Sequence, residues 1–121
     1  LFRVTNGSFV LPLMPTHYKA NPAWFALPFV LQEDLPYSRK DCTAYLNRYG
    51  VDTRPIVGGN LARHPAFWKY RDIAGPLPNA DAIHSNGFYI GLPPFETSME
   101  TIIGTLNGLD SNLRFQVSNG R

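Results

Sequence analysis

The sequence contains a single cysteine, Cys42, and no apolar run near the ~20 residues that a membrane-spanning helix needs. One cysteine cannot form an internal disulfide, and it gives none of the paired Cys/His spacings of a zinc site. The P-loop, the GxGxxG loop, the GxSxG elbow and the HExxH helix are also absent. These absences argue against a disulfide scaffold, a membrane protein, a zinc protein and the commonest nucleotide-binding and hydrolase motifs.

The length and composition fit one globular domain. The chain has 121 residues, of which 44% are hydrophobic and 17% charged, as in folded proteins rather than disordered ones. We expect an extended, proline-punctuated lead-in over residues 1–22, a domain over residues 23–110 and a tail over residues 111–121. Because the first residue is Leu1 and not Met, we expect a piece of a longer protein.

The net charge of +2 hides a basic middle segment. Between Arg39 and Arg71 there are seven basic residues against Asp41 and Asp52, whereas the rest of the chain has four basic and seven acidic residues. Such a local excess suits an anionic small molecule or an acidic surface, although a solvated face explains it equally well. No nucleic-acid motif accompanies it, so neither nucleic acid nor a membrane is an expected partner.

Local patterns predict alternating strands and helices. Residues 23–31, 51–57 and 87–92 read as strands, and Pro28 and Pro55 place two of them at an edge or a bulge. Ser38 and Asp41 form a capping box before a helix that buries Cys42, Tyr45, Leu46 and Tyr49 and ends at Gly50. Short helices are expected over residues 61–70 and from about Asn79. Thr97 and Glu100 cap a last helix whose inner face holds Met99, Ile102, Ile103 and Leu106, and LRFQV near the end alternates like a strand.

This order predicts an α+β domain with a small mixed, largely antiparallel sheet covered by helices. A parallel βαβ sheet is the alternative, and the two strand prolines favour the antiparallel version. His17, His64 and His84 are scattered without a metal-ligand spacing, so no metal site is expected.

Three blocks of sequence resemble one family of enzymes. Residues 45–67, YLNRYGVDTRPIVGGNLARHPAF, are similar to the C-terminal domain of the DegT/DnrJ/EryC1/StrS family. The similarity continues through NPAWFALPFVLQEDLPYSRKD at 21–41 and PLPNADAIHSNGFYIGLPP at 76–94. The Gly-Gly-Asn loop followed by Arg63 most resembles the branch of 4-keto-6-deoxyhexose 3-dehydrases.

The resemblance implies the small C-terminal domain of a fold-type-I aminotransferase-like enzyme. Family members are pyridoxal- or pyridoxamine-phosphate enzymes, either sugar aminotransferases or 3-dehydrases, that act on nucleotide-linked keto-sugars, including lipopolysaccharide sugars. It also implies a cytoplasmic homodimer whose large N-terminal domain carries the cofactor and its lysine or histidine. None of Lys19, Lys40 or Lys69 has the context of that lysine, so no catalytic residue and no bound cofactor are expected in this chain alone.

The resemblance places substrate binding in the Gly-Gly-Asn loop, with Arg54, Asn60, Arg63 and His64 as the expected residues. Arginines supply forked donors to an anion, and Gly58 and Gly59 permit positive φ and close approach of a ligand. Asn60 donates to a hydroxyl or stabilises the turn, and His84 and Asn86 are further candidates. The structural alternative is a simple chain reversal in which Arg54 pairs with Asp52 or Asp81.

A second class of function stays open at this point. The chain could be a standalone binding or dimerisation module derived from that domain, without catalysis. A domain separated from its partner should expose the apolar surface that faced it, and Trp24, Phe25, Phe29, Phe88 and Tyr89 are the expected contributors.

Overall fold

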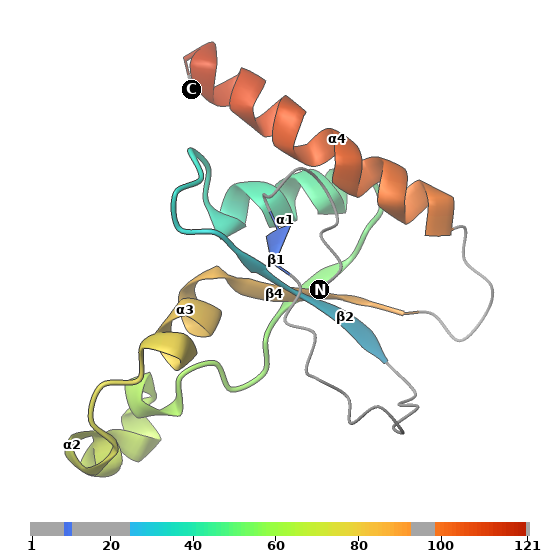
Figure 1. Ribbon diagram of the computed structural model, residues 1–121. Helices are drawn as coiled ribbons and strands as arrows, with labels where there is room; N and C mark the ends of the chain where they lie inside the picture. The colour runs from blue at the N-terminus through green and yellow to red at the C-terminus, as the bar shows by residue number, and fades with distance from the viewer. Residues whose placement is uncertain (1–8, 11–24, 93–98, 121) are drawn as a thin grey trace.

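The computed structural model describes residues 9–10, 25–92 and 99–120, which form a small sheet, two covering helices and a projecting arm (Figure 1). The strands are β1 Phe9–Val10, β2 Ala26–Leu31, β3 Thr53–Pro55 and β4 Gly87–Gly91. The α-helices are α1 Arg39–Arg48, α2 Arg71–Ala74, α3 Pro78–Asn86 and α4 Met99–Ser118, and the 3₁₀ turns are η1 Leu61–Arg63 and η2 Pro65–Tyr70. The residues that were expected to form the lead-in lie mostly outside the described ones.

The four strands form a sheet in the order β1-β2-β4-β3, and every pair is antiparallel. The antiparallel prediction is confirmed, and no described pair is parallel. Pro55 lies in the edge strand β3, as expected from its missing N–H. Pro28 lies in β2 and pairs with Tyr89 of β4 on one side. On the other side β1 pairs only with Val30 and Leu31, so no described strand lies beside Pro28 there to require its missing N–H.

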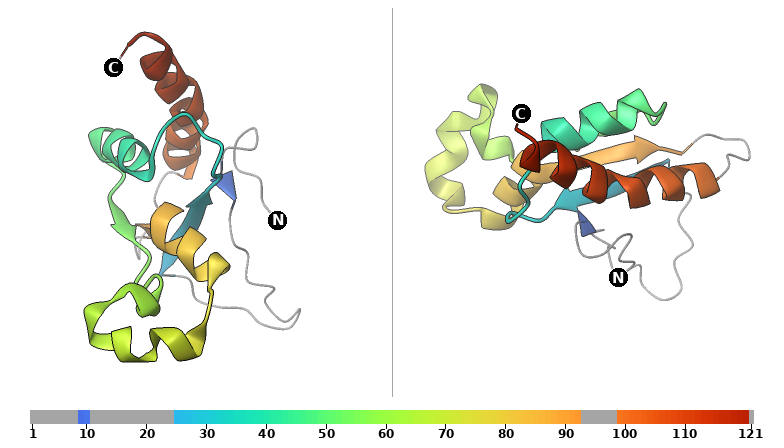
Figure 2. Two further views of the ribbon diagram at one scale, coloured as in Figure 1. Left: turned by 90° about the vertical axis from the view of Figure 1, so that its left-hand side faces the viewer. Right: turned by 90° about the horizontal axis from the view of Figure 1, so that it is seen from above.

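Helices α1 and α4 lie together on one side of the sheet, and the core fills the space between (Figure 2). Along each strand, successive side chains point alternately toward the helices and away from them. Phe29 and Phe88, which are register partners on β2 and β4, both point toward the helices, and their ring centroids lie 5.3 Å apart. The same inward face buries further apolar side chains from β2, α1, β4 and α4, namely Leu31, Cys42, Tyr45, Leu46, Ile90, Ile102, Leu106, Leu109 and Leu113.

Helix α1 follows its sequence signals closely. The Ser38 side chain accepts from the Asp41 N–H, and the Asp41 side chain accepts from the Ser38 N–H, which is the predicted capping box. Cys42, Tyr45 and Leu46 are buried as expected. Tyr49 is not, because it is the C-cap and has left the helical face; its side chain is 56% exposed and packs on Tyr45.

Helix α4 corrects the prediction for the C-terminus. The segment LRFQV is helical, not a strand, and α4 continues without a break through residue 110 to Ser118. The buried residues of α4 follow helical spacing, and Ile103 points outward with 44% of its surface exposed. The proposed cap residue Thr97 lies outside the described residues, and the division of the chain into lead-in, domain and tail stays a prediction.

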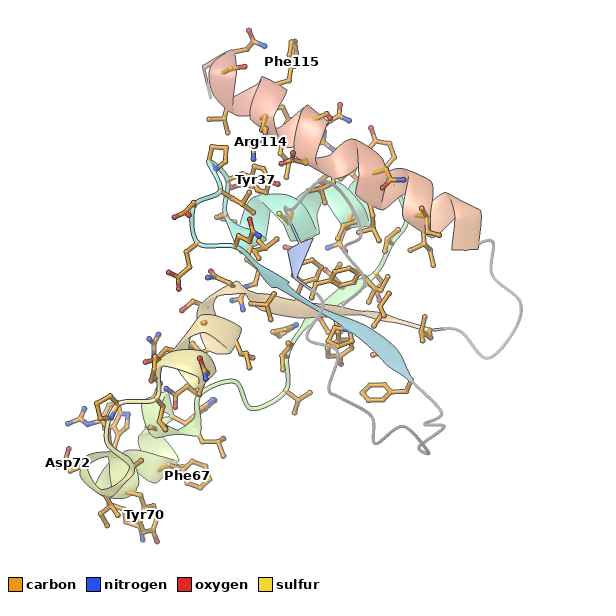
Figure 3. The ribbon with its side chains drawn as sticks, viewed as in Figure 1. Tyr37, Phe67, Tyr70, Asp72, Arg114 and Phe115 are labelled. Atoms are coloured by element: carbon orange, nitrogen blue, oxygen red, sulfur yellow. The ribbon has the colours of Figure 1, made fainter. Side chains whose placement is uncertain are left out.

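Residues 61–77 form an arm that extends from the end of the sheet away from α4 (Figures 1 and 2). The expected helix over 61–70 appears as the two 3₁₀ turns, with Pro65 in the first turn of η2. The arm exposes its large apolar side chains, among them Phe67, Trp68, Tyr70 and Ile73 (Figure 3).

The apolar surface is therefore not where the sequence placed it. Phe29 and Phe88 are completely buried, because both point to the helix-covered face of the sheet. Phe25 is 75% exposed and lies edge-on to Tyr89, in agreement with the prediction. Trp24 is outside the described residues. The main exposed aromatic surface belongs to the arm.

Candidate functional site

The Gly-Gly-Asn loop after β3 borders a hollow of about 520 Å³. Five segments line it: the end of β3 with the loop, the start of α1, the link between η1 and η2, the helix α3, and the strand β4. Its lining residues are Arg39, Arg54, Pro55, Ile56, Val57, Gly58, Gly59, His64, His84 and Tyr89. The lining contains two arginines, two histidines and no carboxylate.

Arg54 lies on the face of the sheet opposite the core. Its register partner Tyr89 lies between the buried Phe88 and Ile90, so alternation points Tyr89 away from the helices. The Arg54 guanidinium is 3.6 Å from the Asp52 carboxylate, and both side chains are largely exposed, at 68% and 84%. An exposed pair at this distance contributes little. The suggested partner Asp52 is thus observed, but Arg54 remains available to a ligand.

Asn60 is buried, with 4% of its surface exposed, and holds the loop in place. Its Oδ1 accepts from the Ala62 N–H at 3.0 Å, which caps η1, and its Nδ2 donates to Asp81 at 2.6 Å. Its backbone N–H donates to Nδ1 of His84 at 3.2 Å. These contacts realise the turn-stabilising role that the sequence left open beside substrate binding.

Arg63 is neutralised within the same network. Its Nε lies 2.6 Å from Oδ1 of Asp81, on helix α3. The hydrogen bond from Asn60, followed by the contacts with Arg63, holds the pKa of the Asp81 carboxyl below its usual range. Asp81 therefore ties the loop to α3, and Arg63 is a partner of Asp81 and does not line the hollow.

His64 lies at the rim of the hollow, between η1 and η2. Its Nε2 is 3.1 Å from the Gly58 carbonyl oxygen, and its ring stands edge-on to the His84 ring with centroids 6.2 Å apart. Asn86, a further candidate, lines a different hollow with Ser38 and Arg39.

Two residues of the site were not in the predicted set. Arg39, at the start of α1, donates from Nη1 to the carbonyl oxygens of His84 at 2.8 Å and of Gly87 at 3.0 Å. His84, on α3, was no more than a further candidate. Both lie far from the loop in sequence, so only the fold shows that they belong to it.

The glycines have the backbone that the sequence predicted. Gly58 has φ +84° and Gly59 has φ +49°. Residues other than glycine rarely adopt a positive φ of this kind. At Gly59 there is a second constraint, since a Cβ atom would lie 2.6 Å from Nδ1 of His84. The loop therefore passes directly over the His84 ring.

The chain is similar to known enzymes of sugar biosynthesis. Over 86 residues the chain is 33% identical to a dTDP-4-dehydro-2,6-dideoxy-D-glucose 3-dehydratase of Saccharopolyspora spinosa, covering 70% of this chain and 18% of the relative. It is 37% identical over 78 residues to the lipopolysaccharide biosynthesis protein RfbH of Salmonella typhimurium, covering 63% and 18%. No family model matches the chain.

This chain is a homologue of sugar 3-dehydratases. A crystal structure of GDP-4-keto-6-deoxymannose-3-dehydratase with a trapped PLP-glutamate geminal diamine matches with a TM-score of 0.52 and 28% identity, over 69% of this chain and 23% of that one. The same enzyme with bound GDP-perosamine matches with a TM-score of 0.53. The resemblance to the dehydrase branch of the DegT/DnrJ/EryC1/StrS family is confirmed, and so is the α+β fold.

The chain spans about a fifth of the length of the curated relatives that it matches. The structural neighbours are enzymes with bound pyridoxal phosphate. Of the described lysines, Lys40 is exposed on α1, and the exposed Lys69 places Nζ 4.8 Å from the centroid of the Tyr70 ring. Neither lysine lines the Gly-Gly-Asn hollow, so the described residues offer no Schiff-base lysine in that hollow.

The described residues, 9–10, 25–92 and 99–120, offer neither a metal site nor a membrane-spanning helix. No group of three or more His, Cys, Asp or Glu side chains in these ranges could hold a metal ion. Within the same ranges, no helix is long and apolar enough to cross a membrane.

Proposed function

We propose that this chain is the C-terminal domain of a pyridoxal- or pyridoxamine-phosphate-dependent enzyme that acts on a nucleotide-linked keto-sugar. The homology to 3-dehydratases favours the dehydrase reaction over amino transfer. The cofactor acts as an electron sink for labilising a sugar carbon next to a ketone, and we assign its binding to the part of the enzyme outside this chain. The role of this chain is to bind and orient the substrate.

The hollow beside the Gly-Gly-Asn loop is the observation that carries this proposal. Arg39 and Arg54 both line it and no carboxylate does, so it attracts an anion. A nucleotide-linked sugar carries its negative charge on the diphosphate, which a planar guanidinium contacts with two parallel hydrogen bonds. Arg54 is the residue we assign to this contact, with His64 at the rim.

Asn60 and Arg63 have a different part in the same function. Their polar groups are engaged with Asp81 and with the backbone of the loop. We propose that they hold the loop in its binding conformation, so that they support substrate binding without contacting the substrate.

The partners follow from the same homology. We propose that the large domain and a second copy of the enzyme complete the active site, and that the exposed aromatics of the arm face one of them. A cytoplasmic location is proposed with them, because nucleotide-linked sugars are the expected substrates. We also propose a role in lipopolysaccharide biosynthesis, because the chain is similar to the lipopolysaccharide biosynthesis protein RfbH.

The test is Arg54→Ala in the complete enzyme. We expect kcat/KM to fall about ten- to a hundredfold, because one charge-assisted contact contributes roughly 1.5–3 kcal/mol once water is excluded. Arg54→Lys should recover little, because a point charge does not reproduce the two-pronged geometry.

Arg71→Ala is the matched control. Arg71 is 3.6 Å from the neighbouring Asp72, and its side chain is 65% exposed, almost as in the Arg54–Asp52 pair. It does not line the hollow, so kcat/KM should stay close to wild type. A fall in melting temperature with normal kinetics in Arg54→Ala would make Arg54 a structural residue and refute the assignment.

A further inference from the structure

His84 is placed by two independent contacts, and both involve the Gly-Gly-Asn loop. Its Nδ1 accepts the backbone N–H of Asn60 at 3.2 Å, so the neutral ring carries its proton on Nε2. The Gly59 backbone passes so close that there is no room for a Cβ atom beside Nδ1. The loop therefore fixes both the tautomer and the position of the imidazole ring.

The opposite nitrogen of the ring, Nε2, has no hydrogen-bond partner among the described residues, whereas Nε2 of the neighbouring His64 is engaged with the Gly58 carbonyl. The His84 ring lines the hollow. An N–H donor of fixed orientation is therefore available in a cavity large enough for a ligand.

The surroundings select the kind of ligand. Arg39 donates to two carbonyl oxygens, and these neutral partners leave its positive charge uncompensated. Arg54 has only the weak exposed pair with Asp52. With both arginines in the lining and no carboxylate there, an oxyanion is favoured over a neutral hydroxyl or a cation.

We propose that His84 binds the substrate directly, donating from Nε2–H to a phosphate oxygen of the diphosphate beside Arg54. This inference rests on the proposed function and extends it, since it adds a second donor from another element. Asn60 then has two tasks, because its side chain holds the loop and its N–H sets the tautomer of the ligand-binding ring.

Two substitutions separate the two ring nitrogens. In His84→Asn the Oδ1 atom reaches the position of Nδ1 and can still accept from the Asn60 N–H, but nothing replaces Nε2. In His84→Gln the longer amide reaches the position of Nε2 and can still donate, but the acceptor for Asn60 is lost. Ser85→Ala is the control, because Ser85 is an exposed neighbour on α3 that does not line this hollow.

The complete enzyme with ¹⁵N-labelled histidine would be titrated with inorganic diphosphate, with dTDP and with a neutral monosaccharide, followed by NMR. We expect both diphosphates to shift the Nε2 signal of His84, and the monosaccharide to leave it unchanged. His84→Asn should weaken diphosphate binding about tenfold or more while the Asn60 amide stays protected from exchange. His84→Gln should show the reverse, with near-normal binding and a fast-exchanging Asn60 amide, and Ser85→Ala should match wild type.

The outcomes separate this inference from the function on which it rests. If Arg54→Ala abolishes diphosphate binding and His84→Asn leaves it unchanged, the role of His84 is wrong and the anion site at Arg54 stands. If neither substitution affects binding, or if wild type binds neither diphosphate, both assignments are wrong. A monosaccharide that shifts His84 while the diphosphates do not would also overturn the inference.

Discussion

Replacing Gly59 with alanine should destabilise the loop far more than the same change at the other positive-φ glycines. Gly59 has φ +49°, near the left-handed region where a non-glycine residue costs about 1–2 kcal/mol. The new Cβ would also lie 2.6 Å from Nδ1 and 3.2 Å from Cγ of His84. The ring must move, and the buried N–H of Asn60 then loses its acceptor, which costs a further 1–3 kcal/mol or so.

The chain provides two matched controls for this substitution. Gly58 has φ +84°, and its nearest neighbour to a new Cβ is Cδ2 of Leu61 at 3.8 Å; Gly50 has φ +78° and nothing within 4 Å. Alanine at either position carries the backbone cost alone, about 1–2 kcal/mol. The difference between Gly59→Ala and these controls therefore isolates the contact with His84.

Urea unfolding followed by circular dichroism gives the free energies, and amide exchange at Asn60 reports the loop directly. Gly59→Ala should lose about 1–3 kcal/mol more than either control and should expose the Asn60 amide to exchange. Measured in a His84→Ala background, Gly59→Ala should cost about as much as the two controls, because the contact with His84 is already lost there. An equal loss in Gly58→Ala and Gly59→Ala, or no coupling to His84, would refute the packing argument.

Four further predictions concern Cys42, Asp81 and the arm. Burial raises the pKa of the Cys42 thiol to about 12 from a usual 9.0, so at pH 8 about one thiol in 10⁴ is ionised. The rate of Cys42 alkylation should therefore be limited by global unfolding, and rapid labelling of the native chain would contradict this. Because the folded pKa is the higher one, the same thiol should make stability fall as pH rises from about 9 toward 12. The pKa of the Asp81 carboxyl is lowered from its usual value of 3.8. Its contribution to stability should therefore be present above pH 3.8 and disappear as the pH falls through the lowered pKa. Asp81→Asn should have a lower melting temperature than wild type at pH 7 and the same one in acid, and a difference that does not change with pH would count against the network. The arm should drive self-association, so the double substitution Phe67→Ser, Trp68→Ser should shift the sedimentation-velocity distribution toward monomer. Phe115→Ser should not, although Phe115 on α4 (Figure 3) is more exposed than either arm residue. An unaltered distribution in the double variant would exclude the arm as the self-association surface.

Local chemistry explains why the first helix and the strand edges could be predicted. The capping box at Ser38 and Asp41 is a contact between residues three apart, so the sequence contains all of it. Pro55 lacks an N–H wherever it lies, which restricts it to an edge. Such elements depend little on the rest of the fold.

The error at the C-terminus has an equally physical cause. The alternation in LRFQV suggested a strand, but only Leu113 of its apolar residues is buried, while Phe115 and Val117 are exposed. Leu113 continues the spacing of Ile102, Leu106 and Leu109, which is the period of a helix. Reading the buried stripe from the start of α4 would have extended the helix, whereas a five-residue window could not.

The residues of the proposed binding site that lie in the Gly-Gly-Asn loop and the strand before it could be predicted from the sequence, whereas those that other elements contribute could not. Arg54 and the two glycines stand in one short stretch, and their chemistry follows from residue type and order. Arg39 and His84 reach the hollow from α1 and α3, and no local pattern links them to the loop. Asp81 was considered as a partner of Arg54, but α3 brings it to Arg63.

The basic segment thus separates into two kinds of arginine, and their partners decide which kind each is. Arg63 lies 2.6 Å from the carboxylate of Asp81, so its charge is neutralised there and the pair holds the loop against α3. Arg39 meets carbonyl oxygens, and Arg54 meets one distant exposed carboxylate, so their charges remain for a ligand. A sum of charges over residues 39–71 cannot make this distinction. The same carboxylate, Asp81, that removes Arg63 from the site also positions Asn60, whose N–H orients His84 toward the hollow. In the proposed site, substrate binding and loop stability are therefore coupled through Asp81, which does not itself line the hollow.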